Sequence, residues 1–251
     1  MSKSLARGDS TARSLKDHAI SKRIEMIARG VRLQGSRLLD IGCGNGLYTI
    51  KMTQVGAQGV GIDVEQDRVQ QAQSFGVRHE ADNVQFLVAS GSRLPFRGSS
   101  FDLVTMIEVL EHVERDRDAL RECWRVLRPH GRLVLFVPNK LWLFETHGMR
   151  LGRRELDFGF IPFVSWAPEF VRRRIQRARI YSSAGLLTLL REEGYKARVI
   201  DYMWPPLDKE IGPLRMRVLR LALRQVASRL ERSPLRMFGL SIFLVAQKVG
   251  E

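Results

Sequence analysis

A short segment in the first fifth of the chain combines carboxylates with closely spaced glycines. Asp40-Ile-Gly42-Cys-Gly44-Asn-Gly46 has glycine at alternate positions, and Asp63 follows Gly42 by 21 residues. Glycine tolerates a positive φ and lets a ligand approach the backbone closely. The third glycine comes one residue earlier than in the dinucleotide pattern G-x-G-x-x-G, and a carboxylate before the loop suits a cationic ligand better than a diphosphate. Asp63 has the spacing of a carboxylate that binds both ribose hydroxyls.

Alternating strands and helices must position these residues. Short apolar runs predict strands at 37–41, 59–63, 84–89, 101–106 and 132–137, and helical spacing predicts helices at 47–55, 67–75 and 118–127. Pro129-His-Gly131 is expected to end the last of these helices. This alternation predicts an α/β fold with a mostly parallel, doubly wound sheet, whose ligands bind at the carboxyl ends of the strands. The site is therefore expected around Asp40, Asp63, Ser90, Ile107 and Pro138.

The composition is that of a globular chain with a large basic excess. It has 251 residues, of which 44% are hydrophobic, and a net charge of +14 at pH 7. These values exclude a disordered tail or a collagenous repeat. The charge is uneven, because residues 1–36 carry +5, residues 37–139 carry −1 and residues 140–236 carry +10. An anionic partner is thus expected to concern the flanking segments rather than the neutral middle block.

The absence of certain sequence features predicts a cytoplasmic protein. No apolar run approaches the roughly 18 residues that span a bilayer, and the N-terminus has no apolar signal core. Cys43 and Cys123 lack metal-ligand spacing and cannot form a disulfide framework, so each is expected to stay a reduced thiol and no metal is expected.

Several longer motifs occur together between residues 36 and 139. They are LLDIGCGNG at 38–46, VGID at 60–63, SRLPF at 92–96 followed by SSFDLV at 99–104, and EVLEHV at 108–113 leading to RVLRPHGRLVLFVPN at 125–139. As a set they resemble the class I S-adenosylmethionine-dependent methyltransferases, particularly the ubiquinone- and menaquinone-biosynthesis-like group (methyltransferase type 11). The resemblance implies a Rossmann-like sheet of seven strands, with 196–201 and 239–247 as its last two strands, the final strand antiparallel, and a helical insertion after strand five.

The resemblance also implies S-adenosyl-L-methionine as the cofactor. The three glycines would pass beneath its methionine portion, Asp40 would help to hold its amino group, and Asp63 would bind its ribose. Ser90 stands where the family usually has an acidic residue that contacts the adenine amino group, so the backbone or a serine hydroxyl would take that contact. The expected cofactor-binding residues are Asp40, Gly42, Cys43, Gly44, Asn45, Gly46, Asp63, Val64, Ser90, Gly91, Ser92, Ile107 and Glu108.

Methyl transfer from a sulfonium needs few catalytic side chains, because the methyl group is already activated and the protein mainly aligns the reactants. A hydroxyl acceptor would profit from a base with a pKa near neutrality, which favours histidine. His112 follows the fourth strand and His147 follows the fifth, so both are candidate catalytic residues. The alternative for His112 is a packing or hydrogen-bonding role, and the alternative for His147 is a role in the site other than that of the base.

Residues 140–236 are expected to cover the acceptor. Aromatic residues are concentrated at its start, which favours an apolar acceptor, although these rings could instead only pack the insertion onto the sheet. Two Arg-rich stretches follow at 171–180 and 214–232, and the second has an amphipathic pattern. Such a helix can lie on an anionic membrane, hold RNA, or simply expose its arginines to solvent. The aromatic residues are Trp142, Phe144, Phe158, Phe160, Phe163, Trp166 and Phe170.

These observations predict one methyltransferase domain over 1–251. It would comprise a basic N-terminal helical segment (1–36), a cofactor-binding core (37–139), an acceptor lid with basic helices (140–236) and a final strand (237–251). The predicted function is methyl transfer to oxygen of a small, hydrophobic or lipid-like acceptor by a cytoplasmic protein with peripheral contact to an anionic membrane. The alternatives are an RNA methyltransferase and a non-catalytic, cofactor-binding regulator. Nucleic acid is the less favoured partner, because Thr105-Met-Ile-Glu-Val109 replaces the Asn/Asp-Pro-Pro-aromatic run of nucleic-acid amino-methyltransferases.

Overall fold

The computed structural model describes residues 20–145, 149–151, 154–156, 161–175, 178–204 and 229–249. The predictions that concern His147, Phe158, Phe160 and most of the stretch 214–232 lie outside this part of the chain.

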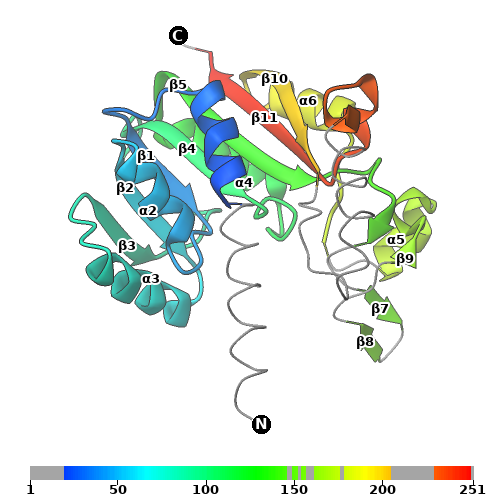
Figure 1. The fold of residues 1–251 in the computed structure, drawn as a ribbon, viewed down its shortest axis with the longest axis horizontal. Coiled ribbons are helices and arrows are strands. Elements are labelled where there is room, and N and C mark those ends of the chain that lie inside the picture. The colour runs from blue at the N-terminus through cyan, green and yellow to red at the C-terminus, as the bar shows by residue number, and fades with distance from the viewer. Residues whose placement is uncertain are drawn as a thin grey trace, which may run out of the picture.

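A seven-stranded sheet forms the centre of the protein (Figure 1). Its order is β10-β11-β5-β4-β1-β2-β3. Strands β1 to β5 pair in parallel with their neighbours, whereas β11 is antiparallel to both β5 and β10. The predicted Rossmann-like sheet with an antiparallel last strand is confirmed. The strands are β1 (Arg37–Ile41), β2 (Gln58–Asp63), β3 (Val84–Val88), β4 (Phe101–Ile107), β5 (Leu127–Pro138), β10 (Tyr195–Met203) and β11 (Ser241–Lys248).

Helices cover both faces of this sheet, because the strands are apolar on both sides. Leu133 and Leu135 of β5 pack into the cluster that contains residues of α4 (Asp116–Val126) and α6 (Ser183–Glu192). The intervening Val134 and Phe136 face a second cluster, which includes a helix over residues 20–30 and Met52 of α2 (Leu47–Gln54). Helix α3 (Gln66–Arg78) packs beside α2 over β2 and β3 (Figure 1).

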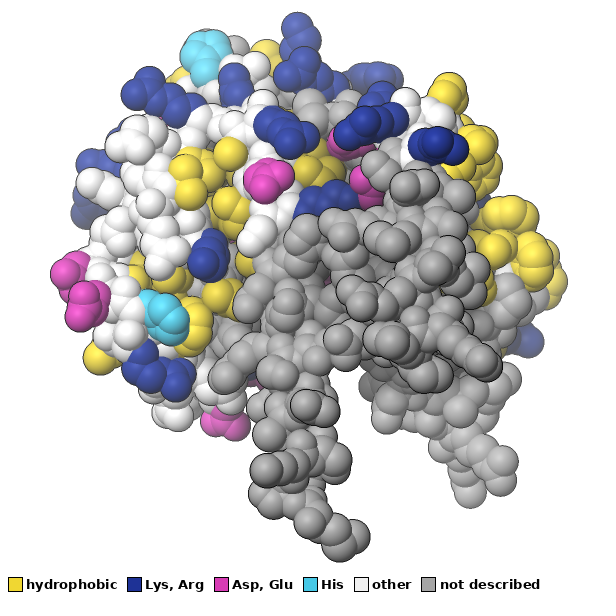
Figure 2. Space-filling view, viewed as in Figure 1, with side chains coloured by type: hydrophobic (Ala, Val, Ile, Leu, Met, Phe, Trp, Pro, Cys, Tyr) yellow, Lys and Arg dark blue, Asp and Glu magenta, His cyan; other side chains and the backbone are white. Residues whose placement is uncertain are grey.

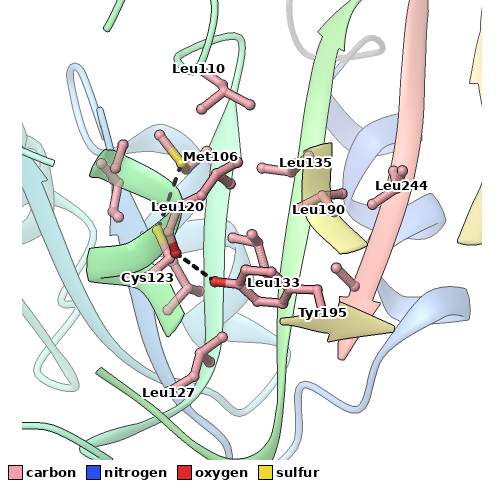
Figure 3. Packing of buried hydrophobic residues seen from close by; sticks show 14 of the residues in the cluster. Met106, Leu110, Leu120, Cys123, Leu127, Leu133, Leu135, Leu190, Tyr195 and Leu244 are labelled. Atoms are coloured by element: carbon pink, nitrogen blue, oxygen red, sulfur yellow. Dashed lines mark hydrogen bonds between the residues drawn. The ribbon is translucent and has the colours of Figure 1, made fainter. Parts of the chain in front are cut away.

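Figure 3 shows the larger cluster, in which α4 and α6 meet the sheet. Cys123 of α4 lies with its sulfur 3.9 Å from the sulfur of Met106, and the hydroxyl of Tyr195 donates to the carbonyl of Leu120 at 2.8 Å. Burial raises the pKa of the Cys123 thiol to about 12. Cys43 and Cys123 are both buried free cysteines.

Two local predictions differ from the structure. Helix α4 ends at Val126, before Pro129, and Leu127 already belongs to β5, because its buried side chain pairs with Phe101 across the sheet. The insertion after β5 was expected to be helical, but its described part also contains two short antiparallel ladders. These pair β6 (Phe144–Glu145) with β9 (Ile161–Pro162) and β7 (Met149–Leu151) with β8 (Arg154–Leu156).

The insertion continues with a 3-10 helix, η1 (Val164–Trp166), and the short helix α5 (Glu169–Ile175). Another 3-10 helix, η3 (Pro234–Phe238), precedes β11. Among the described residues, none of the helices combines the length and apolar composition needed to cross a membrane.

Candidate active site

The glycine loop lies at the carboxyl end of β1. The backbone N–H groups of Gly42 and Cys43 both donate to the carbonyl of Ile62, at 2.8 and 2.9 Å, which ties the loop to the end of β2. Gly42, Gly44 and Gly46 have φ of 70°, 54° and 81°, in the left-handed region that favours glycine. The structure therefore requires glycine at alternate positions for backbone reasons alone.

The surroundings of the three glycines divide them into two kinds. A Cβ on Gly42 would lie 2.4 Å from Val109 Cγ2, and one on Gly46 would lie 2.7 Å from Phe86 Cζ, so both positions are closed by packing. A Cβ on Gly44 would meet, among the described residues, only the guanidinium of Arg68 at 3.8 Å. The middle of the loop therefore leaves space for a ligand against the backbone.

Asp40 is buried behind this loop. Its Oδ1 and Oδ2 accept hydrogen bonds from the hydroxyls of Thr105 and Thr49, each at 2.7 Å. Burial raises the pKa of its carboxyl group to about 6, although the two threonine hydrogen bonds lower it. These contacts join β1, α2 and β4. Because both carboxyl oxygens already accept a threonine hydroxyl, an effect of Asp40 on a ligand would act through its charge. The predicted contact with a ligand amino group stays a prediction.

Asp63 ends β2 and faces the same loop. Its Oδ2 accepts from the N–H of Gly44 at 2.9 Å, and its Oδ1 accepts from the N–H of Glu65 at 3.0 Å. These two bonds hold the carboxylate in one orientation, and each oxygen retains capacity for a further donor. Val64, directly after Asp63, is 66% exposed and presents an apolar surface beside the carboxylate.

The other predicted residues lie at neighbouring strand ends. The N–H of Ala89 donates to the carbonyl of Asp63, which brings Ser90 beside the end of β2. Ser90 is exposed, and its hydroxyl accepts from the N–H of Ser92 at 3.3 Å. The parallel register thus brings the loops after β1, β2 and β3 to one edge of the sheet. Asn45 is exposed there, whereas Cys43, Gly91 and Ile107 are buried.

A charged network around Glu108, one of the predicted site residues, closes the site on the β4 side, and the sequence analysis missed its partner Arg23. Glu108, which has φ of 55°, accepts from Arg23 Nη2 at 2.9 Å and from the hydroxyl of Ser241 at 2.6 Å. Arg23 Nη1 also donates to the hydroxyl of Tyr48 at 2.8 Å, and its guanidinium lies 5.6 Å from the ring centre of Phe136. Arg23 therefore connects the helix over 20–30 to α2 and β4. In the sequence, Arg23 is only one of many basic residues, so no local signal marks it as part of this network.

Replacing Arg23 by methionine is expected to lower the free energy of unfolding by about 3 kcal/mol, because it breaks the largely buried ion pair with Glu108. Urea unfolding would measure this change. Arg29→Met is the matched control, because Arg29 lies on the same helix and is 75% exposed. Equal stability losses in the two variants would contradict this role for Arg23.

Glu111 lies in the same loop with its side chain buried. Burial, with a further contribution from the charge of Glu108, raises the pKa of Glu111 to about 9. Since the carboxyl group of the unfolded chain ionises near 4.5, the folded protein keeps a proton that the unfolded chain loses between these two pH values. Stability is therefore expected to fall as pH rises through this range.

Glu111→Gln should flatten this pH dependence, because the neutral amide has no proton to lose. The difference between the wild-type and variant slopes should approach ~1 kcal/mol per pH unit in the window from 4.5 to about 9. Urea titrations at a series of pH values measure it, with the exposed Glu114→Gln as control. Parallel pH profiles for Glu111→Gln and the wild type would disprove the assignment.

His112 is the candidate base that the structure describes. Its side chain is 53% exposed, and its Nε2 lies 3.9 Å from Oε1 of Glu111. Both residues line a cavity of about 800 Å³, which also includes Lys140 after β5, Arg172 of α5 and Ser182 before α6. Ser182 is the N-cap of α6 and accepts from the N–H of Gly185 at 3.2 Å. A histidine thus faces a ligand-sized cavity at the carboxyl ends of β4 and β5.

Comparison with known proteins agrees with this geometry. Residues 39–135 match a family model described as a methyltransferase domain. The chain is 36% identical over 125 residues to a ubiquinone biosynthesis O-methyltransferase of Xanthomonas oryzae pv. oryzae, covering 49% of this chain and 52% of the relative. A protein of the same name from Nitrosococcus oceani is 32% identical over 141 residues, covering 55% and 59%. The chain thus spans about half the length of the curated relatives it matches.

Solved structures extend the likeness of the fold to nearly the whole chain. A crystal structure of an S-adenosylmethionine-dependent methyltransferase from Mesorhizobium loti has a TM-score of 0.61 at 18% identity, covering 89% of this chain and 96% of that one. The YcgJ protein of Bacillus subtilis also has a TM-score of 0.61, at 20% identity, covering 94% and 100%.

The residues on the edge of the sheet suit S-adenosylmethionine, the cofactor of this family. The space at Gly44 admits a ligand against the backbone, the oriented carboxylate of Asp63 suits a pair of hydroxyls, and the exposed Val64 suits a flat apolar ring. The matched family model, the glycine loop and the fold together identify residues 39–135 as a methyltransferase domain, and the curated relatives to which the chain is similar are ubiquinone biosynthesis O-methyltransferases.

Proposed function

We propose that this chain transfers a methyl group to an oxygen atom of a small, hydrophobic or lipid-like acceptor. The observation that carries the proposal is the oriented carboxylate of Asp63 beside the open backbone at Gly44. When bound, S-adenosylmethionine supplies a methyl group that is already activated on a positively charged sulfur. The chain itself then has to bind, orient the reactants, exclude water and accept a proton.

Four residues would share the binding of the cofactor. Asp63 would accept hydrogen bonds from the ribose hydroxyls, because backbone N–H groups already hold both of its oxygens in place. Val64 would contact the adenine ring, and Ser90 would take the polar contact for which the family commonly uses an acid. The buried charge of Asp40 would favour the cationic end of the cofactor.

His112 would accept the proton of the acceptor hydroxyl. It faces the cavity of about 800 Å³, and Glu111 lies behind it at 3.9 Å. A neutral imidazole is a suitable base near pH 7. His147 remains a second candidate for this role, in the part of the chain that the structure does not describe. The name O-methyltransferase of the curated relatives supports oxygen as the methylated atom.

Incubation with methyl-labelled cofactor and a fractionated cell extract tests the proposal. Label is expected in an organic-solvent fraction of small molecules. Alkali should not release this label as methanol, because the expected product is an ether. His112→Gln should lower kcat by about a hundredfold while cofactor affinity is unchanged, which is the usual effect of losing a general base. Label in RNA, or no transfer to any fraction despite cofactor binding, would contradict the proposal.

A further inference from the structure

Large apolar side chains are exposed on one side of the insertion. Phe163, Trp166 and Phe170 are 58%, 49% and 70% exposed, and the rings of Phe163 and Trp166 pack edge to face at 5.6 Å. On η3, Leu235 and Met237 are 50% and 41% exposed. Figure 2 shows hydrophobic side chains gathered along the right edge of the molecule, where Figure 1 places η3 and α5.

Direct contacts connect these two exposed groups. The indole N–H of Trp204 donates to a carbonyl of η3 at 3.3 Å, and its ring lies 5.9 Å from that of Trp142. Trp142 in turn packs 5.8 Å from Phe144, and the N–H of Phe163 donates to the carbonyl of Leu143 at 2.8 Å. A continuous series of aromatic and backbone contacts thus leads from η3 to η1.

Exposed arginines accompany the apolar side chains. Arg174 lies on α5, Arg232 lies just before η3 and Arg236 lies within it, and all three are exposed. Arg236 contacts Asp201 at 3.8 Å, an exposed pair that contributes little to stability. The docking face is defined here as Phe163, Trp166, Phe170, Leu235 and Met237 with these three arginines.

We propose that the docking face binds the surface of an anionic lipid bilayer. Contiguous exposed apolar patches on soluble domains mark interaction surfaces. Exposed Trp and Phe side chains flanked by arginine match the chemistry of a membrane interface, where rings enter the headgroup region and cations meet anionic lipids. RNA would use the arginines, but it would leave Leu235 and Met237 without a partner.

The docking face adjoins the proposed acceptor cavity through α5. Phe170 of that helix belongs to the face, whereas Glu169 and Arg172 line the cavity. Resting on the proposed function, this arrangement places the cavity where a lipid-like acceptor could enter from the bilayer. The docking itself does not depend on catalysis.

Flotation of the full chain with vesicles tests the proposal. The protein should float with phosphatidylcholine vesicles that contain phosphatidylglycerol, and much less with phosphatidylcholine alone. Trp166→Ser combined with Phe170→Ser should weaken binding roughly tenfold or more, because it removes two rings from the membrane contact. Val77→Ser with Leu87→Ser is the matched control, since these apolar residues are 80% and 41% exposed on α3 and β3.

Tryptophan fluorescence gives a second measurement. Emission should shift to shorter wavelength when anionic vesicles are added, and Trp166→Phe should lose most of this shift while it still floats. Absence of flotation, equal binding by the Trp166/Phe170 variant, or displacement of the wild type from vesicles by RNA would overturn the proposal. Asp63→Asn should float normally while binding cofactor poorly. A failure of the docking proposal can therefore be distinguished from a failure of the proposed function.

Discussion

Asp63→Ala should reduce the affinity for S-adenosylmethionine by at least about a hundredfold. The carboxylate is held by the N–H groups of Gly44 and Glu65, so it offers a preformed acceptor to two hydroxyls. Two hydrogen bonds to a charged group contribute roughly 3 kcal/mol together, which corresponds to about 150-fold in Kd. Isothermal titration with the cofactor or its demethylated product measures the loss.

Two further variants separate binding from folding in this experiment. Asp63→Asn keeps the shape of the side chain and one acceptor, so its fold should be intact while affinity still falls. Asp82→Ala removes an exposed carboxylate from the turn before β3, at the end of that strand that lies away from the site. This variant should bind the cofactor as the wild type does. Unchanged affinity in both Asp63 variants would remove Asp63 from the site.

The second large effect is expected at Gly42. Gly42→Ala combines a left-handed backbone with a Cβ 2.4 Å from Val109, so it should lower the free energy of unfolding by about 3 kcal/mol. Gly44→Ala has similar backbone strain but open space, and should cost about 1 kcal/mol. Its methyl group would occupy the ligand space, so this variant should instead lose affinity for the cofactor. Urea unfolding and cofactor titration measure the two effects.

Controls follow from the same geometry. Gly35→Ala has φ of 74° with nothing within 4 Å among the described residues, so it should show the strain of Gly44→Ala without any loss of cofactor affinity. Adding Val109→Ala to Gly42→Ala should recover part of the lost stability, because it removes the clashing methyl groups. Equal effects of Gly42→Ala and Gly44→Ala on stability and on binding would contradict the conclusion that Gly42 is closed by packing while Gly44 is open.

Local patterns were sufficient to predict the strands and the glycine loop, because both depend on residues that are neighbours along the chain. The apolar runs of β1, β2 and β4 differ from the predicted strands by at most one residue at each end. The boundary between α4 and β5 was misjudged, because Leu127 is drawn into the sheet by Phe101, which is distant in sequence. The β6–β9 ladder of the insertion depends likewise on pairing partners 16 to 18 residues apart, such as Phe144 and Pro162.

The sequence by itself determined the fold class and the resemblance to methyltransferases, and it predicted which residues lie at the carboxyl edge of the sheet, because glycines, carboxylates and strand ends lie close together along the chain. Only the tertiary structure decided that Gly42 and Gly46 are closed by packing while Gly44 is open, and that Arg23 and Ser241 both donate to Glu108. Side chains from residues 23, 108 and 241 meet only when the sheet has formed. Their electrostatics and their burial are therefore properties of the folded chain.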